Sequence, residues 1–186
     1  MEYIIIAGII AVVAYVIMIY NGLVKARQMV REAWSGIDVQ LKRRSNLIPN
    51  LLETVKGYAK HESDTLAEVT RMRTAAGNVS SDDVAGRSAA EGMLGMALGK
   101  LMAVAEAYPD LKANEGFRDL QNSLEEIENE IQMSRRYYNG TARDLNTKVE
   151  SFPSNLVAGQ FGFAQADYFE IENAAERAVP QVDFGS

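Results

Sequence analysis

The side chains that most often carry chemistry are scarce in this chain. There is no cysteine and His61 is the only histidine, which excludes disulfides and thiol nucleophiles and argues against a zinc site. A Ser-His-Asp triad would have to use His61, and no nucleophile motif accompanies it. His61 stands beside Glu62 and could sense pH near neutrality, but an exposed helical histidine is the simpler interpretation.

Four glutamates lie close together in the sequence, at Glu125, Glu126, Glu128 and Glu130. On a helix these positions spread over several faces and do not converge on one metal ion. A diiron bundle would also need Glu-x-x-His pairs on facing helices, and the residue three places before His61 is Tyr58. We interpret the glutamates as a solvated surface, and we expect no metal, no cofactor and no enzymatic activity.

Three glycines, Gly92, Gly95 and Gly99, lie among alanines at helical spacing. A phosphate-binding loop would place its glycines between a strand and a helix, whereas these fall inside a helical pattern. We predict that they allow close packing of a neighbouring helix.

The most informative element is an uncharged, almost wholly apolar run between Tyr3 and Tyr20. As a helix, its 18 residues would rise about 27 Å, close to the roughly 30 Å of bilayer hydrocarbon. Tyrosines are favoured at both membrane interfaces. We therefore predict a transmembrane anchor over residues 1–22, with the span at about 3–20. The alternative is a cleaved signal peptide, which needs a basic n-region, a shorter apolar stretch and a small-residue cleavage site.

Charge flanks the apolar run on one side. Lys25, Arg27 and Arg31 follow it and no cation precedes it, so the positive-inside rule places the N-terminus outside and residues 23–186 in the cytoplasm. Residues 1–60 carry eight Lys or Arg against four acids, and residues 61–186 carry eleven against twenty-one. The three cations are candidate contacts to an anionic leaflet, unless they only set topology. The acidic remainder argues against a nucleic-acid partner.

One face of the apolar run carries small residues. Ala7, Ala11 and Ala14 recur at steps of four and three, with Gly8 beside them, and small residues let helices approach closely in lipid. Tyr15, near mid-membrane, would prefer a hydrogen-bonding partner there. These five residues are a candidate interface between spans, and they predict a homo-oligomer.

Beyond the anchor, apolar residues recur at helical spacing. The first stripe contains Val30, Trp34, Ile37, Leu41, Ile48, Leu51 and Val55, and the second contains Phe117, Leu120, Leu124, Ile127, Ile131, Ser134, Tyr138, Leu145, Val149 and Phe152. Pro49 either kinks the first helix or divides it. We expect helices at about 23–46 and 49–76, and a third that is capped within residues 80–83 and runs to about residue 107. A fourth, with Asn114 as its N-cap, should extend to Phe152, where Pro153 ends it.

The pattern predicts an all-α fold in which a transmembrane helix precedes a long antiparallel bundle of about four helices. Trp34 and Pro49 are its packing and kink positions. A continuous coiled coil is the alternative, which Pro49 and Pro109 disfavour. An irregular segment follows, with aromatics at Phe161, Phe163, Tyr168, Phe169 and Phe184. We expect these aromatics to pack on the bundle, unless they make an intermolecular contact.

Three stretches, at residues 38–62, 103–117 and 151–158, resemble the LemA family of bacterial membrane proteins. The FGF, YFE and VDF triplets between Phe161 and Phe184 extend the similarity over nearly the whole chain. The resemblance implies a single-pass protein of the bacterial inner membrane with its N-terminus outside and a helical body inside. It implies no reaction. Some relatives are linked to forming or shaping internal membranes in magnetotactic bacteria.

Two functional hypotheses follow. In the first, the protein is a non-enzymatic, membrane-anchored scaffold that contacts lipid, self-associates, and organises or shapes the membrane. In the second, it is a membrane-tethered adapter that recruits a cytoplasmic protein through its acidic helices or its aromatic C-terminal segment.

Overall fold

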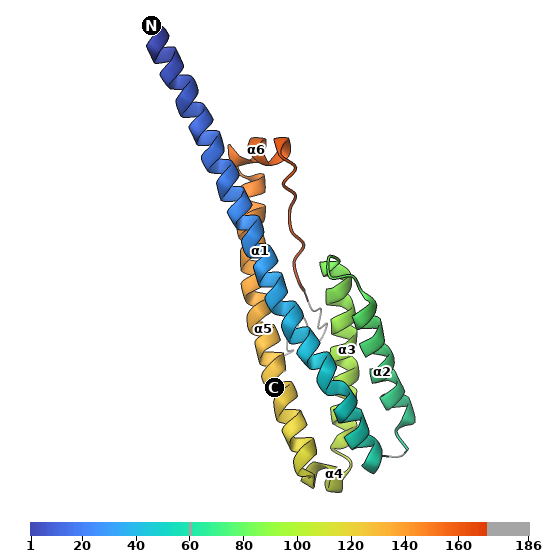
Figure 1. Cartoon of the computed structure of the whole chain (residues 1–186). Helices are drawn as coiled ribbons and strands as arrows, with labels where there is room; N and C mark the ends of the chain where they lie inside the picture. Colours follow the sequence, from blue (N-terminus) through green and yellow to red (C-terminus); the bar gives the residue numbers. More distant parts are fainter. Residues whose placement is uncertain (60, 171–186) are drawn as a thin grey trace, which may run out of the picture. The chain divides into compact units, whose positions relative to one another are not determined.

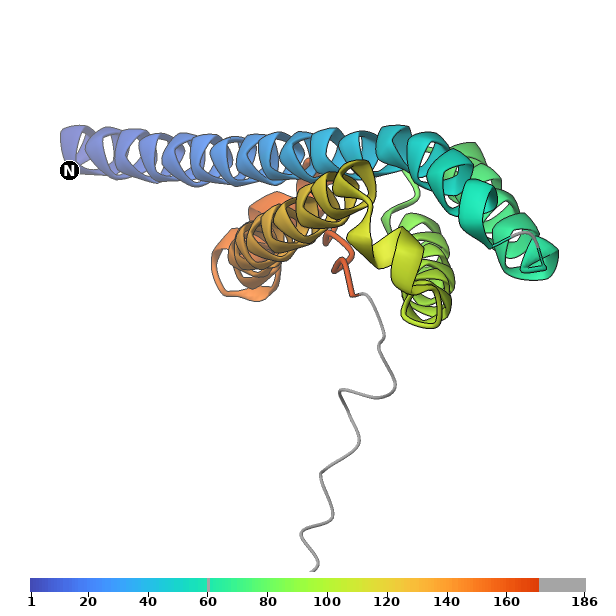
Figure 2. The same ribbon diagram turned by 90° about the horizontal axis from the view of Figure 1, so that it is seen from below.

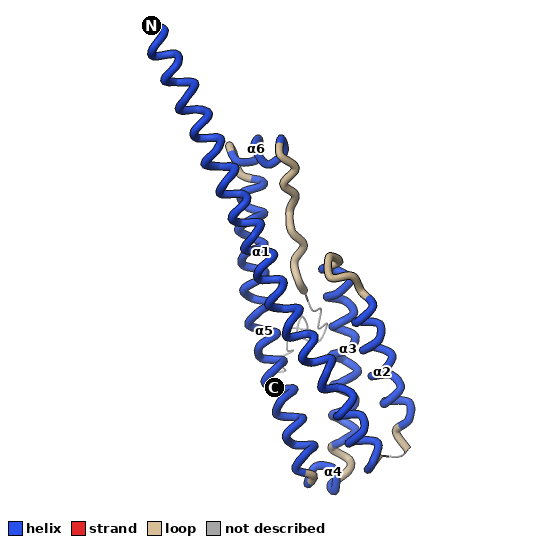
Figure 3. Tube along the Cα trace, in the orientation of Figure 1, coloured by secondary structure: helices blue, strands red, loops and turns tan. Residues whose placement is uncertain are grey.

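The computed structural model of the protein describes residues 1–59 and 61–170. Its helices are α1 (Glu2–Tyr58), α2 (Ser63–Asn78), α3 (Val84–Ala105), α4 (Pro109–Ala113), α5 (Glu115–Glu150) and α6 (Ser154–Gln160). Short connecting segments join them, and the described residues contain no strand (Figure 3). The prediction of an all-α fold is confirmed.

The chain divides into two compact units, each containing parts of α1 and α5 (Figure 1). The first unit consists of residues 1–44 and 125–169, and the second contains residues 45–124 together with Glu170. Each unit has its own buried side chains.

In the first unit, α1 and α5 run antiparallel, side by side (Figures 1 and 2). The Lys148 ammonium reaches the Gly22 carbonyl at 3.4 Å, and at the other end the Arg44 guanidinium pairs with the Glu128 carboxylate. The two stripes predicted from the sequence meet here. Their buried members in this unit include Val30, Ile37, Leu41, Ile127, Ile131, Tyr138 and Leu145.

The second unit packs aliphatic and alanine side chains into one cluster. Its members come from α1, α2, α3, α4 and α5, and they include Ile48, Leu51, Val55, Val69, Leu94, Leu101, Leu111 and Phe117. Alanines such as Ala90 and Ala97 on α3 are buried in the same cluster. Because an alanine has only a methyl side chain, it lets neighbouring backbones approach each other closely.

Pro49 neither ends nor divides α1, which continues through it to Tyr58. Because proline has no N–H, it cannot donate to the carbonyl of residue i−4, which here is Ser45. In the structure Arg73 Nε of α2 donates to that Ser45 oxygen at 2.9 Å. A side chain 28 positions away therefore satisfies the acceptor that Pro49 leaves free, and this lost hydrogen bond is one of the costs of a proline inside a helix.

The expected helix over residues 49–76 is wrong, because the chain breaks between α1 and α2. Val55 and Ala59 before the break and Val69 after it belong to one buried cluster, which requires the chain to reverse. The reversal is held by side chains that the periodicity did not indicate. The Tyr108 hydroxyl donates to Glu62 at 3.1 Å, and the Asn114 amide donates to the Tyr58 hydroxyl at 3.0 Å.

Both predicted N-caps are present. Asp83 accepts a hydrogen bond from the Gly86 N–H at 2.8 Å at the start of α3. Asn114 accepts one from the Phe117 N–H at 2.9 Å at the start of α5. Each cap satisfies one of the four N–H groups that a helix start leaves without a partner. The short helix α4 was not predicted.

The C-terminal segment begins with α6 and is therefore not irregular throughout. Phe163 and Phe169 are buried as expected, whereas Phe161 and Tyr168 are exposed. Phe152, which the sequence pattern placed on a buried stripe, is 80% exposed, because α5 ends at Glu150. Phe184 lies outside the described residues.

Candidate membrane interface

The N-terminal part of α1 is bare in the structure. It contains the helix window that is long and apolar enough to cross a membrane, and none of that window is buried. Ala7, Gly8, Ala11, Ala14 and Tyr15 are all exposed there. Their predicted role between spans concerns contacts with another chain, and it stays a prediction.

The first fully buried side chain of α1 is Leu23, just after the apolar run. From there the buried residues Leu23, Ala26, Val30 and Ala33 follow helical spacing along one face of α1. One helix therefore contains a bare apolar part followed directly by an amphipathic part. The predicted division between an anchor at residues 1–22 and a body from residue 23 stays a prediction.

An aromatic cluster lies where the apolar run ends. The Tyr20 ring stands edge-on to Phe161 at 5.0 Å and to Phe163 at 5.6 Å. The Arg27 guanidinium carbon lies 4.7 Å from the centre of the Phe163 ring, a cation–π distance. Arg27, which was predicted to contact lipid, is thus half-buried and contacts the Phe163 ring of its own chain.

The other two predicted cations, Lys25 and Arg31, are exposed. The fold adds Lys148, from the last turn of α5, to the same end of the first unit. Sequence reasoning missed Lys148 because the pairing of Gly22 with the end of α5 depends on tertiary structure. The sequence did predict an antiparallel bundle, however, and in such a bundle the last turn of α5 lies near residue 23 of α1. That arrangement was the available indication for Lys148.

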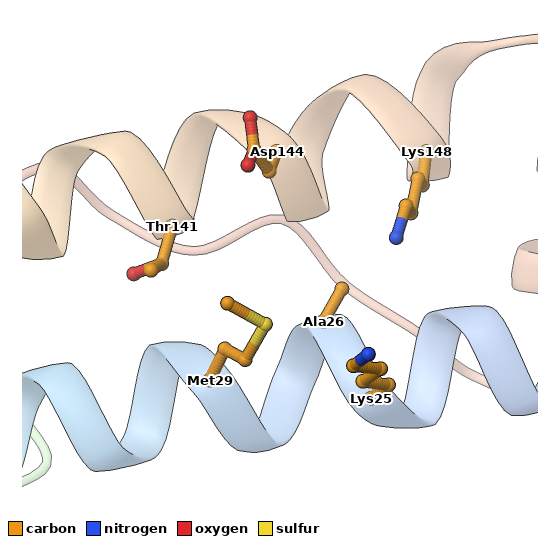
Figure 4. A pocket seen from close by; sticks show the side chains of 6 residues that line it. All are labelled: Lys25, Ala26, Met29, Thr141, Asp144 and Lys148. Carbon is orange, nitrogen blue, oxygen red and sulfur yellow. The ribbon is translucent and has the colours of Figure 1, made fainter.

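A cavity of about 200 Å³ lies between α1 and α5. It is lined by Lys25, Ala26, Met29, Thr141, Asp144 and Lys148 (Figure 4). In this view the Lys148 ammonium points toward α1, and the Asp144 carboxylate points away from it. The cavity is smaller than the roughly 300–1,000 Å³ typical of small-molecule sites, but its two ammonium groups could bind an anionic group.

A segment that we call the C-terminal strap, residues 163–169, holds the aromatic cluster in place. The Asn139 side chain forms two hydrogen bonds with the backbone of Phe169, at 2.9 and 3.1 Å. Asn146 binds the backbone of Ala166 in the same way, at 2.8 and 3.0 Å. Each amide thus pairs with the strap as a neighbouring strand would.

The spacing of the two asparagines explains why both can bind. Seven residues of α5 and three residues of extended chain each span about 10 Å, so Asn139 and Asn146 match Phe169 and Ala166. Sequence reasoning missed this pairing. Two asparagines seven residues apart on the buried face of a helix were the available indication.

The strap also closes the aromatic core of the first unit. The Trp34 ring lies 5.5 Å from both Tyr138 and Phe169, and the Tyr138 hydroxyl donates to the Asp167 carbonyl at 2.8 Å. Burial, together with the negative charge of Asp167, raises the pKa of Tyr138 to about 12. Trp34, predicted as a packing residue, therefore lies between α5 and the strap.

The remaining predicted packing positions lie on α3. Gly92 and Gly95 are half-buried and Gly99 is exposed. A Cβ atom added at Gly95 or Gly99 would meet no atom within 4 Å among the described residues. Close packing there would need another chain, and it stays a prediction.

The residues that the structure describes thus form a helical protein, and one of their helices is long and apolar enough to cross a membrane. The sequence pattern of the LemA family matches residues 33–184. The chain belongs to the LemA family.

Three relatives show the extent of the similarity. The magnetosome protein MamQ 2 of Paramagnetospirillum magneticum is 28% identical, covering 92% of this chain and 72% of its own length. The magnetosome protein MamQ of Magnetospirillum gryphiswaldense is 25% identical, with 94% and 74% covered. Protein LemA of Metamycoplasma hominis is 27% identical, with 81% and 68% covered.

Proposed function

We propose that this protein is a non-enzymatic, membrane-anchored helical scaffold that self-associates and organises or shapes the bacterial inner membrane. The observation that carries the proposal is the division of α1. Its apolar part is bare, while the part from Leu23 onward has one buried face. A bare apolar helix in water would expose a patch far larger than a soluble monomer tolerates, whereas lipid would cover it.

The cations support one orientation. Lys25, Arg31 and Lys148 gather on the body side of the apolar run, where an anionic inner leaflet would attract them. The positive-inside rule then places the N-terminus outside and the body in the cytoplasm.

Two surfaces support self-association. One is the small-residue face of the span at Ala7, Gly8, Ala11 and Ala14, which would allow close approach of a second span. The other lies on α3, where Met93 and Met96 are 44% and 59% exposed. Methionine-rich surfaces adapt to protein partners. Two of the relatives described above are magnetosome proteins, which supports the membrane-organising part of the proposal.

The orientation can be tested by cysteine labelling, because the chain has no cysteine of its own. A membrane-impermeant maleimide should label Glu2→Cys in intact spheroplasts. It should label Lys42→Cys, on the exposed surface of the body, only after the membrane is permeabilised. The reverse pattern would contradict the proposed topology, and label-accessible protein in the soluble fraction would contradict the anchor.

Self-association can be tested with a photo-crosslinking residue at Met96 and, as a matched control, at Val39, which is 53% exposed on α1. The scaffold should give dimers of this chain from position 96, and mass photometry in detergent should show more than one copy. Crosslinks mainly to a different protein would favour the adapter hypothesis. A strictly monomeric protein that leaves liposomes unchanged would refute the scaffold.

A further inference from the structure

Several large apolar side chains in and beside α6 are exposed on the surface of the first unit. Phe152, Leu156 and Phe161 are 80%, 64% and 54% exposed. Residues 151–166 contain no Asp, Glu, Lys or Arg, although 24% of the chain is charged. Outside the N-terminal apolar run, no other stretch without charge in the sequence is as long.

The fold does not need these three side chains for its own core. α6 is attached through its other side, where Val157 and Ala158 are buried. The exposed apolar side chains therefore form a distinct surface, which we call the α6 corner (Phe152, Leu156 and Phe161).

The backbone fixes the shape of this corner. After α6, Gly162 adopts a positive φ of 69°, and the Phe163 N–H donates to the Ala158 carbonyl at 2.9 Å. This is the hydrogen bond of a Schellman C-cap, in which glycine favours the left-handed conformation. The strap then continues from Phe163 to the clamps at Asn146 and Asn139. The corner is thus held at a defined place on the first unit.

That place is the end of the apolar run. Phe161 of the corner contacts Tyr20, the last residue of the run, with ring centres 5.0 Å apart. Figure 1 shows α6 beside this part of α1, with the N-terminal part of α1 extending past it. Any bilayer that contains residues 3–20 would therefore have its interface next to the α6 corner.

Two lysines lie near the α6 corner. Lys25 and Lys148 lie at the same end of the first unit and line one cavity, so that cations adjoin the uncharged corner. This is the composition of interfacial membrane segments, in which apolar side chains enter the boundary between headgroups and acyl chains and cations pair with anionic lipids.

We propose that the α6 corner is a second membrane contact, in which Phe152, Leu156 and Phe161 enter the same leaflet in which the apolar run ends. This proposal rests on the membrane anchor proposed above. The protein would then hold the bilayer at two places, the span and the corner, which fixes the rotation of the first unit about the axis of α1.

The test uses the full chain in proteoliposomes containing anionic lipid, with one environment-sensitive fluorophore on a single introduced cysteine. Three labelled variants are compared: Leu156→Cys at the corner, Ile10→Cys in the apolar run, and Val39→Cys as the control. Ile10 and Val39 are exposed to a similar degree in the isolated chain, at 62% and 53%. Quenching by brominated lipid reports contact with acyl chains, and quenching by aqueous iodide reports contact with water.

We expect position 156 to be quenched by brominated lipid and protected from iodide, as position 10 is, and position 39 to show the opposite. Adding Phe152→Ser and Phe161→Ser should raise iodide quenching at position 156 several-fold without changing position 10. Iodide quenching at 156 equal to that at 39, with position 10 in lipid, would overturn the corner and leave the anchor intact. Iodide quenching at both 10 and 156 would overturn the anchor. Protection of position 156 from both quenchers would indicate a protein contact and would also overturn the corner.

Discussion

In the first unit, side chains of α5 hold a non-helical strap by hydrogen bonds to its backbone, whereas in the second unit helices pack directly on helices. Asn139 and Asn146 each form two such bonds, and the strap seals the rings of Trp34 and Tyr138. The second unit instead buries aliphatic and alanine side chains. The first unit therefore adds directional contacts with the strap to its buried apolar stripes, whereas the cluster of the second unit is built mainly from filled volume.

The strongest test of this comparison removes volume from the second unit. Leu51 is fully buried in its cluster, so Leu51→Ala should lower the free energy of unfolding by about 2–5 kcal/mol. The measurement is denaturation of the full chain in detergent, followed by circular dichroism. Glu53→Ala, on the exposed side of the same helix, should change stability by less than about 0.5 kcal/mol. Emission from Trp34 under native conditions should stay unchanged.

Removing one clamp of the first unit should give a smaller but more local effect. Asn139→Ala leaves the N–H and carbonyl of Phe169 without these partners, which should cost about 1–3 kcal/mol. Because Phe169 packs on Trp34, the only tryptophan, the emission of Trp34 should move to longer wavelength. Asn129→Ala, at an exposed position of α5, is the control. Unchanged emission in Asn139→Ala would mean that the clamp does not hold the strap.

One directional contact of the second unit, between Arg73 and the Ser45 carbonyl, can be isolated by a double-mutant cycle. Arg73→Met should cost about 1–2 kcal/mol, because the Ser45 carbonyl then has neither Arg73 nor a residue-49 N–H as donor. In a Pro49→Ala background the backbone N–H gained at position 49 can bond to Ser45, so the same substitution should cost clearly less. Equal costs in both backgrounds would show that Arg73 does not compensate for Pro49.

The smallest expected effect is a pH dependence in the first unit. Burial and Asp167 raise the pKa of Tyr138 to about 12 from the usual 10, so the unfolded chain releases this proton first as pH rises. Stability should be unaffected by Tyr138 below pH 10, and it should fall between about pH 10 and 12. The measurement is the difference between wild type and Tyr138→Phe, because Tyr108 also has a raised pKa. A difference that stays constant across that range would contradict the assignment.

The parts of this fold that could be predicted from sequence are those that depend on residues close together in the chain, such as the helical spacing of apolar side chains. The stripe through Ile37, Leu41 and Ile48 marks a buried face, and all three are fully buried. The cap at Asn114 was also predictable, and the cap before α3 was predictable to within residues 80–83, because a cap bonds to an N–H only three residues away.

The parts that could not be predicted depend on residues distant in sequence. The Ser45 carbonyl that Pro49 leaves free accepts from Arg73, and the backbone of the strap is bonded by Asn139 and Asn146. Phe152 was predicted to be buried because its spacing continues the apolar stripe of α5. The helix ends at Glu150, before Phe152, and the side chain is exposed. In the candidate interface, the sequence indicated Tyr20 and Lys25 but not Lys148, which arrives there only through the antiparallel pairing of α5 with α1.

The passage of α1 from its bare part into the first unit has a mechanical consequence. Asn21 and Gly22 lie at this junction, yet both remain helical, and neither a proline nor a loop interrupts the backbone there. Sharp kinks in helices almost always need a proline, a Gly/Ser pair, a π-bulge or an inserted group, and α1 continues as an α-helix through this junction. If the apolar part spans a bilayer as proposed, a change in its tilt, such as a thinner or thicker bilayer would impose, would therefore turn the first unit together with it.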